Sequence, residues 1–203
     1  MSDHYFASQP ASTDERREVT LTLAGQRVSV ETASGVFSAD RLDLGTTVLL
    51  NHVADPPASG TFVDLGCGWG PITLSLGLLA PEARILAVDV NERARDLTAR
   101  NAASLGLPNI EVADPQSALA SLPSGGIDLI WSNPPIRIGK DALHELLETW
   151  LTRLAPGGRA ELVVAKNLGS DSLQRWITTH LSLPCERTAS SKGFRVLAVT
   201  RPR

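Results

Sequence analysis

The sequence predicts an α/β protein whose main sheet is doubly wound and mostly parallel. Three observations predict this class. From Thr61 onward, short apolar strands alternate with helical segments, and such alternation gives a parallel sheet covered by helices on both faces. The last two strands are joined by SSKG alone, so they must run antiparallel. Residues of ligand-binding type follow the strand ends, which is where sheets of this kind bind ligands.

The first sixty residues are predicted to extend this main domain. Residues 1–18 are polar and charged, and we expect a loose arm there. The segment EVTLTLAGQRVSVET has two alternating stretches around AGQ, which indicates a β-hairpin. ASGVFSADRLDLGTTVLLNHV then supplies a glycine-containing loop and a helix. The predicted organisation is an arm, hairpin and helix over residues 1–60, packed on a main domain over residues 61–203.

The main domain is predicted to contain seven strands with helices between most of them. The strands in order are TFVDLG, ARILAVDV, NIEVA, IDLIWS, GRAELVVA, PCERTAS and FRVLAVTR. The helices are 71–80, 91–105, 116–122, 141–154 and 170–181. IDLIWS is apolar enough to be buried on both faces, as expected of a strand within a parallel sheet.

Composition excludes several classes of protein. The chain of 203 residues, 42% hydrophobic and 20% charged, is long enough for one sizeable core. It has neither an apolar run long enough to span a bilayer nor a secretory signal, so we expect a cytoplasmic protein without a membrane partner. Cys67 and Cys185 show no metal-ligand spacing, and no metal site is expected. With a net charge of −3, a nucleic-acid partner would require a local basic patch.

A glycine-rich loop, DLGCGWGP (residues 64–71), follows the first strand of the sheet. Glycines permit a tight turn and close approach to a ligand, and the next helix directs free N–H groups toward it. The loop departs from the dinucleotide fingerprint, which would require glycine in place of Pro71. An ordinary strand-to-helix turn is the alternative for the loop taken alone.

Acidic residues around this loop indicate a ribose-bearing ligand without phosphate. Asp89 ends the strand about twenty residues after the loop, where it can accept hydrogen bonds from both ribose hydroxyls. Asp114 ends the next strand and can accept from an adenine amine; a helix N-cap is the alternative for both residues. Asp64 would repel a pyrophosphate and attract an ammonium group. This disfavours NAD and favours S-adenosylmethionine.

The stretches VDLGCGWG, AVDVN, SNPPI and APGG, in this order, resemble class I S-adenosylmethionine-dependent methyltransferases. HYF, GVFSADRLDLGTTVLL and KGFRVL extend the resemblance to the small-domain group that includes the guanine-N2 methyltransferases of small-subunit ribosomal RNA. The resemblance implies a Rossmann-like, seven-stranded sheet with an antiparallel last strand. It also implies S-adenosyl-L-methionine as methyl donor, S-adenosyl-L-homocysteine as product, and ribosomal RNA or the small subunit as partner. The residues implied in cofactor binding are Asp64, Gly66, Cys67, Gly68, Gly70, Asp89, Val90, Asp114 and Asn133.

Some members of that group carry a second, degenerate domain before the catalytic one. Residues 1–60 are too few for such a domain, so we expect substrate docking to differ. The resemblance leaves the oligomeric state open, with a monomer favoured.

The resemblance assigns catalysis to Asn133, Pro134, Pro135 and Ile136. In the family, an Asn-Pro-Pro-aromatic motif binds a planar NH₂ group. The Asn133 side-chain oxygen and the Pro134 carbonyl would accept the two hydrogens of a guanine amine and direct its lone pair at the methyl group. The prolines stiffen the loop. Ile136 replaces the usual aromatic residue, so stacking on the base would fall to Phe37 or Phe194.

Basic residues beyond the strand ends are predicted to form a rim around the cofactor site. They are Arg137, Lys140, Lys166, Lys192 and Arg195. Phosphate contact is the natural use of such a rim on an acidic protein, and scattered surface charge is the alternative. The sequence therefore predicts a guanine-N2 methyltransferase acting on ribosomal RNA. The alternatives are an enzyme methylating a protein glutamine or another planar amine, and a non-catalytic cofactor-binding module.

Overall fold

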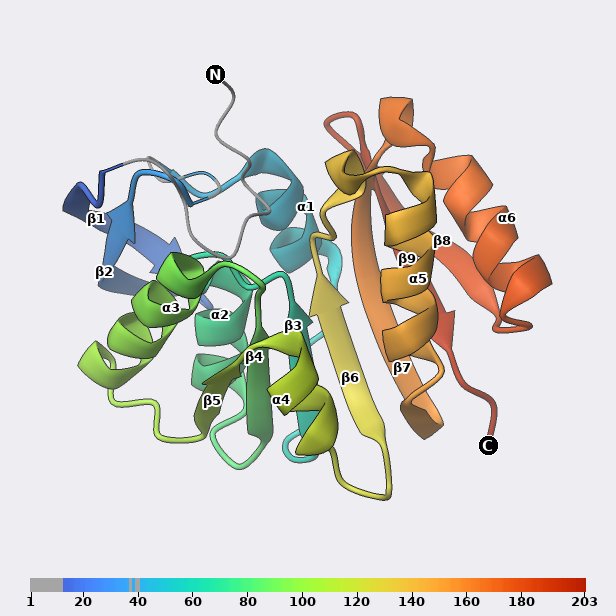
Figure 1. Cartoon of the computed structure of the whole chain (residues 1–203), viewed down its shortest axis with the longest axis horizontal. Coiled ribbons are helices and arrows are strands. Elements are labelled where there is room, and N and C mark those ends of the chain that lie inside the picture. The colour runs from blue at the N-terminus through green and yellow to red at the C-terminus, as the bar shows by residue number, and fades with distance from the viewer. Residues whose placement is uncertain (1–12, 37, 39–40) are drawn as a thin grey trace.

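A computed structural model describes residues 13–36, 38 and 41–203 of the chain (Figure 1). Seven strands form one sheet in the order β5-β4-β3-β6-β7-β9-β8, and β1 and β2 form a second sheet. The strands of the main sheet are β3 (Thr61–Leu65), β4 (Arg84–Val88), β5 (Ile110–Ala113), β6 (Ile127–Ser132), β7 (Leu154–Ala165), β8 (Cys185–Ser191) and β9 (Phe194–Thr200). Strand β9 lies between β7 and β8 and is antiparallel to both, whereas β3 to β7 are parallel. The predicted fold class is confirmed.

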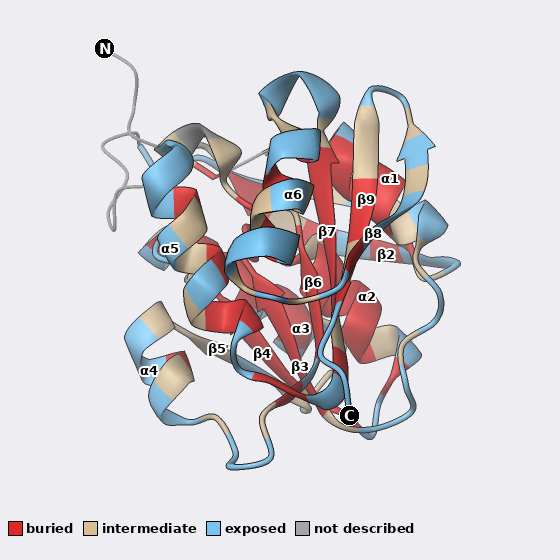
Figure 2. Ribbon diagram, turned by 90° about the vertical axis from the view of Figure 1, so that its right-hand side faces the viewer, coloured by how far each residue is buried: buried red, intermediate tan, exposed pale blue. Residues whose placement is uncertain are grey.

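Helices cover both faces of this sheet (Figure 2). They are α1 (Leu44–His52), α2 (Pro71–Leu79), α3 (Glu92–Ser104), α4 (Pro115–Ala120), α5 (Lys140–Leu151) and α6 (Ser170–His180). One apolar cluster joins α4, α5 and α6 to one face of the sheet, and two others join α1, α2 and α3 to the opposite face. Among the residues that the structure describes, no helix is both long and apolar enough to cross a membrane.

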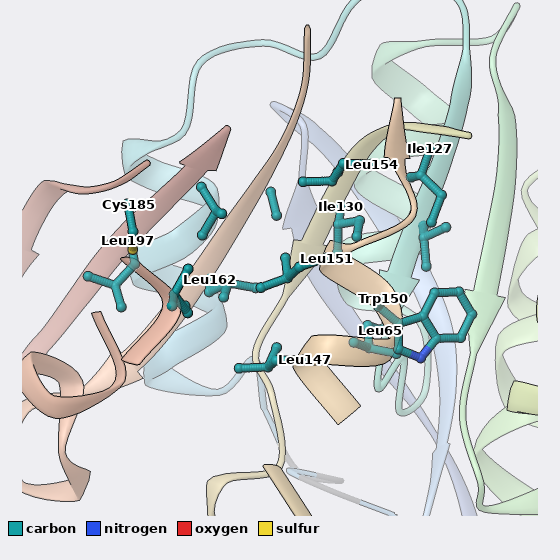
Figure 3. Close-up of a cluster of buried hydrophobic side chains, with 14 of the residues drawn as sticks. Leu65, Ile127, Ile130, Leu147, Trp150, Leu151, Leu154, Leu162, Cys185 and Leu197 are labelled. Atoms are coloured by element: carbon teal, nitrogen blue, oxygen red, sulfur yellow. The ribbon is translucent and has the colours of Figure 1, made fainter. Parts of the chain in front are cut away.

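Helix α5 illustrates how the sequence pattern produces this packing. Its buried residues Leu143, Leu147, Trp150 and Leu151 recur at the spacing of one helical face. Figure 3 shows Leu147, Trp150 and Leu151 within a cluster that includes side chains of β6, β7 and β9. Burying each large apolar side chain stabilises the fold by about 1.5–3 kcal/mol. The face of α5 that carries these residues therefore fixes the helix on the sheet.

The N-terminal hairpin consists of β1 (Arg16–Leu23) and β2 (Gln26–Ala33), as predicted around AGQ. Its two-residue turn has φ of 48° at Ala24 and 75° at Gly25, which suits the right-handed twist of a hairpin. The hairpin begins at Arg16, inside the segment expected to be a loose arm, because its first residues pair with the end of β2. Strand β7 also begins earlier than predicted, at Leu154 rather than Gly158.

Asn101 of α3 attaches this hairpin to the glycine-rich loop. Its side-chain oxygen accepts a hydrogen bond from Glu31 N at 2.7 Å, and its amide nitrogen donates to Glu31 O at 2.9 Å. The same nitrogen donates to Trp69 O at 2.9 Å. One buried amide therefore joins β2, α3 and the loop after β3. The carboxyl ends of β3, β4, β6 and β7 and the start of β9 meet at one edge of the main sheet, which is where the loop lies.

Candidate active site

A cavity of about 720 Å³ opens at this edge of the sheet. Its volume is within the range of small-molecule sites. The predicted site residues that line it are Gly66, Cys67, Gly68, Asp89, Val90, Asn133, Pro134, Pro135, Ile136 and Phe194. The structure thus brings most of the predicted cofactor residues and the Asn-Pro-Pro segment into one cavity, whereas Asp64, Gly70 and Asp114 do not line it.

The glycine-rich loop forms one wall of the cavity. The backbone N–H groups of Gly66 and Cys67 donate to Val88 O at 2.8 and 3.0 Å, which holds the loop against the end of β4. Gly68 has φ of 59°, and a Cβ atom added there would meet no atom within 4 Å. The open space at Gly68 lets a ligand approach the backbone. Thr98 of α3 supports the loop from behind, since its hydroxyl donates to Gly68 O at 2.9 Å.

Asp64 lies behind this wall and does not itself line the cavity. Its carboxylate is fully buried, and Oδ2 accepts hydrogen bonds from Thr73 N at 2.9 Å and Thr73 Oγ1 at 2.6 Å. The other oxygen, Oδ1, has no hydrogen-bond partner among the described residues. Burial raises the pKa of the Asp64 carboxyl to about 7, and the bonds from Thr73 offset only part of that effect. The carboxyl group fastens the start of α2, and once ionised it places negative potential beneath the loop.

Asp89 lines the cavity directly after the end of β4. Its two oxygens accept hydrogen bonds from Gly68 N and Asn91 N, each at 2.9 Å. Each oxygen keeps a further lone pair, so the carboxylate can accept from two hydroxyls. Asn91, rather than Asp89, caps α3 by accepting from Arg93 N and Ala94 N. Burial raises the pKa of Asp89, against the lowering effect of the two backbone bonds.

Asp114 caps a helix, which was the alternative to adenine binding in the sequence analysis. It is the N-cap of α4, with Oδ1 accepting from Gln116 N at 2.9 Å and Ser117 N at 3.0 Å. Its Oδ2 accepts from Ser117 Oγ at 2.6 Å. The next residue, Pro115, lines the cavity, whereas Asp114 does not. Most of the hydrogen-bonding capacity of this carboxylate is therefore used within the protein.

The Asn-Pro-Pro segment leaves β6 beside the glycine-rich loop. Ser132 Oγ donates to Leu65 O at 2.6 Å and so joins the ends of β6 and β3. The carbonyl of Pro134 accepts from Ile136 N at 2.8 Å, across Pro135 with φ of −74° and ψ of 72°. This is an inverse γ-turn, for which the fixed φ of proline is well suited. One lone pair of the Pro134 carbonyl is thus occupied and the second remains for a ligand.

Two apolar side chains, Ile136 and Phe194, line the cavity together with Asn133. Ile136 is partly buried against the cluster of α5 and α6, and Phe194 against the cluster of α1 and α2. A Cβ atom added at Gly45 would lie 3.0 Å from Phe194 Cε1 and 3.2 Å from Asn133 Nδ2. The Phe194 ring therefore lies near the Asn133 amide. Phe37, the other predicted aromatic contact, lies outside the described residues.

The five basic residues predicted to form a rim differ in their surroundings. Lys140, Lys166 and Lys192 are exposed, and Lys166 N donates to Gly193 O at 2.9 Å, which brings the β8–β9 turn to the end of β7. Arg195 forms an ion pair with Asp171 at the start of α6, so its charge is balanced within the protein. The side chain of Arg137 lies outside the part that the structure describes.

Sequence reasoning missed the part that α1 plays in this site. Asp43 and Thr46 line the cavity, and both accept hydrogen bonds from Asn133 Nδ2, at 2.8 and 3.1 Å. The only signal was GVFSADRLDLGTTVLL, which supported the family resemblance without assigning a role to either residue. An aspartate before a helix usually reads as an N-cap, and Asp43 is also one.

Comparison with known proteins gives matches to a family model, to related sequences and to solved structures. The family model of the methyltransferase small domain matches residues 27–198. Ribosomal RNA small subunit methyltransferase C of Pseudomonas paraeruginosa (strain DSM 24068 / PA7) is 34% identical over 187 residues, which cover 90% of this chain and 54% of that protein. The uncharacterized protein YbxB of Bacillus subtilis (strain 168) is 33% identical over 174 residues, covering 85% of this chain and 86% of that protein.

A solved structure, the 16S rRNA N2 G1207 methyltransferase of T. thermophilus in complex with AdoMet and guanosine, aligns with a TM-score of 0.74. It is 20% identical and covers 95% of this chain and 52% of the other, so it shows the shared fold. The chain spans about half the length of the curated ribosomal RNA methyltransferases named above. The extent of the family match shows that the chain belongs to the methyltransferase small-domain family.

Proposed function

We propose that the protein transfers a methyl group from S-adenosylmethionine to the exocyclic N2 amine of a guanine in ribosomal RNA, in the cytoplasm. The observation that carries the proposal is a pair of acceptors that the described residues leave available, Asn133 Oδ1 and the second lone pair of the Pro134 carbonyl, next to the wall formed by the glycine-rich loop and Asp89. An amine held by these acceptors would lie beside a bound methyl donor.

The residues of the cavity fit the cofactor. Open space at Gly68 admits a ligand to the backbone, and Asp89 offers one free lone pair on each oxygen for a ribose diol. Oδ1 of Asp64, which has no hydrogen-bond partner in the described part of the chain, favours a ligand with a positive group near the loop and disfavours a pyrophosphate. We propose that Asp64 acts through the loop, because its carboxylate lies behind the cavity wall. When bound, the cofactor supplies a methyl group already activated on a sulfonium.

The chain's own residues would then orient the acceptor amine. Asn133 Oδ1 and the remaining lone pair of the Pro134 carbonyl accept the two hydrogens of a planar NH₂ group, which directs its nitrogen lone pair at the methyl group. The same acceptors stabilise the positive charge that develops on the nitrogen. Orientation of this kind contributes up to about 7–11 kcal/mol in favourable intramolecular models. No general base is required before the amine nitrogen attacks the methyl group, since the amine loses its proton after the methyl group has transferred.

The residues on the substrate side of the cavity favour a nucleobase that belongs to a nucleic acid with a phosphate backbone. Phe194 offers an aromatic ring near Asn133, and Ile136 offers apolar contact on the cavity wall. Lys140, Lys166 and Lys192 remain as exposed cations beyond the strand ends on a chain of net charge −3. Phosphate contacts from these lysines would position the RNA without reading its sequence.

The test uses purified protein and S-adenosylmethionine carrying a labelled methyl group. Ribosomal RNA and small subunits from a strain lacking the gene are the substrates, and digested nucleosides are identified by mass spectrometry. We expect labelled N2-methylguanosine, and Asn133→Ala should slow its formation by about 100- to 1000-fold while leaving a measurable residual rate. Label in another nucleoside, or in ribosomal protein instead of RNA, would refute the guanine-N2 assignment. The double variant Lys140→Gln/Lys192→Gln separates the targets, because it should weaken methylation of RNA and spare that of a protein side chain.

A further inference from the structure

The start of α1 lies against the Asn-Pro-Pro segment, although the two are ninety residues apart in the chain (Figure 1). Asn133 Nδ2 donates to Asp43 Oδ2 at 2.8 Å and to Thr46 Oγ1 at 3.1 Å. Gly45 lies between them, and a Cβ atom there would be 2.9 Å from Asp43 Oδ2 and 3.2 Å from Asn133 Nδ2. The contact therefore depends on a residue without a side chain at position 45.

These two bonds determine which end of the Asn133 amide faces a ligand. A carboxylate accepts hydrogen bonds and cannot donate them, so the amide nitrogen must be the atom that faces Asp43. Both N–H bonds of that nitrogen are engaged, one by Asp43 and one by Thr46. Turning the amide by half a rotation would place Oδ1 against the Asp43 carboxylate, which loses that bond and sets two acceptors against each other, whereas the Thr46 hydroxyl can adapt by donating. Asn133 Oδ1 is thus the amide atom left for a ligand.

We propose that Asp43, assisted by Thr46, is a positioning residue that holds Asn133 as a hydrogen-bond acceptor in the methyl-transfer site. This inference rests on the proposed function, in which the acceptor is needed to bind an NH₂ group. The negative charge of Asp43 also polarises the amide through its N–H group, which strengthens Oδ1 as an acceptor. Without Asp43, the amide can present its donor end, which repels the hydrogens of an amine.

Asp43 also has a structural role at the start of α1, which is distinct from positioning the Asn133 amide. Asp43 is the N-cap of α1, since Oδ2 also accepts from Thr46 N at 3.0 Å, and its backbone carbonyl accepts from Thr47 Oγ1 at 2.8 Å. Thr46 and Thr47 provide a matched pair of substitutions. Thr46→Val removes the acceptor of the Asn133 bond, and Thr47→Val removes only the bond to the Asp43 carbonyl.

The activity test compares these variants on ribosomal RNA from the strain lacking the gene. Loss of a hydrogen bond to a charged group predicts that Asp43→Ala lowers kcat by about 10- to 100-fold. Thr46→Val should lower kcat by a smaller factor, and Thr47→Val should leave it unchanged. The Kd of S-adenosylhomocysteine, measured by calorimetry, should stay the same in all three. Equal losses in Thr46→Val and Thr47→Val would show that the helix start matters and the Asn133 contact does not.

Two further variants distinguish positioning from direct action on the substrate, since Asp43 also lines the cavity. Asp43→Asn keeps an acceptor oxygen and a good N-cap, so it should recover most of the activity that Asp43→Ala loses. In the Asn133→Ala background, Asp43→Ala should cause no further loss, because it acts through Asn133. Additive losses, or an Asp43→Asn variant as inactive as Asp43→Ala, would instead assign Asp43 a direct catalytic role and overturn the proposal.

A readout that needs no substrate keeps this inference distinct from the proposed function. In ¹⁵N–¹H spectra of the whole chain, the side-chain NH₂ signal of Asn133 should be shifted and protected from solvent exchange. Asp43→Ala should move it to the position of a free amide, and Thr47→Val should not. A free amide signal in the unmodified protein would overturn the inference. A protected amide together with an absence of RNA methylation would refute the proposed function alone.

Discussion

Burial of Asp64 leads to a prediction about stability that can be worked from the structure. The folded protein raises the pKa of this carboxyl from 3.8 to about 7, mainly because the group is fully buried. Below pH 3.8 it is protonated in both the folded and the unfolded chain. As the pH rises toward 7, the unfolded chain ionises while the folded chain does not, so the free energy of unfolding falls. The pKa difference of roughly 3 units between the folded and the unfolded chain lowers the free energy of unfolding by about 4 kcal/mol, and this full loss is reached once the pH exceeds 7.

The substitution Asp64→Asn keeps the shape of the side chain and removes its charge. The difference in free energy of unfolding between this variant and the unmodified protein should therefore shift in favour of the variant by up to about 4 kcal/mol between pH 4 and pH 8. Urea unfolding followed by tryptophan fluorescence at a series of pH values measures this difference. Saturating S-adenosylhomocysteine should reduce it, because the ligand's ammonium group offsets the buried charge. A difference that stays constant over this pH range would refute the reasoning.

Three other predictions concern the loop, the hairpin and the rim. Gly68→Ala places a methyl group in the cavity at a left-handed position, so the Kd of S-adenosylhomocysteine in calorimetry should rise, with a stability cost of about 1–2 kcal/mol. Asn101→Ala removes three hydrogen bonds and should lower the free energy of unfolding by about 2–4 kcal/mol, with faster amide exchange at Glu31 as the local signature. Each of Lys140→Gln and Lys192→Gln should reduce the salt dependence of RNA binding, with a change in log–log slope of roughly 0.7 per lost phosphate contact; an unchanged slope would exclude that lysine from the interface.

Much of the fold could be predicted from local pattern. Strand-to-helix alternation identified the parallel sheet, and the short SSKG connection required an antiparallel pair at the end. The structure adds that β9 inserts between β7 and β8, an order that depends on which strand edges pair in space. β7 begins at Leu154 because the segment before Gly158 pairs with the start of β6, which the apolar pattern did not reveal.

In the candidate site, too, some features could be predicted from the local sequence and others depend on tertiary packing. The sequence by itself determined the glycine-rich loop, Asp89 and Asn133, because each follows directly from a strand end and its chemistry depends on its immediate neighbours. Only the tertiary structure decided the Asp43–Asn133 contact and the Arg195–Asp171 ion pair, because their partners are brought together by sheet and helix packing. A side chain's residue type states which bonds it can make, and the fold decides which partner comes within reach.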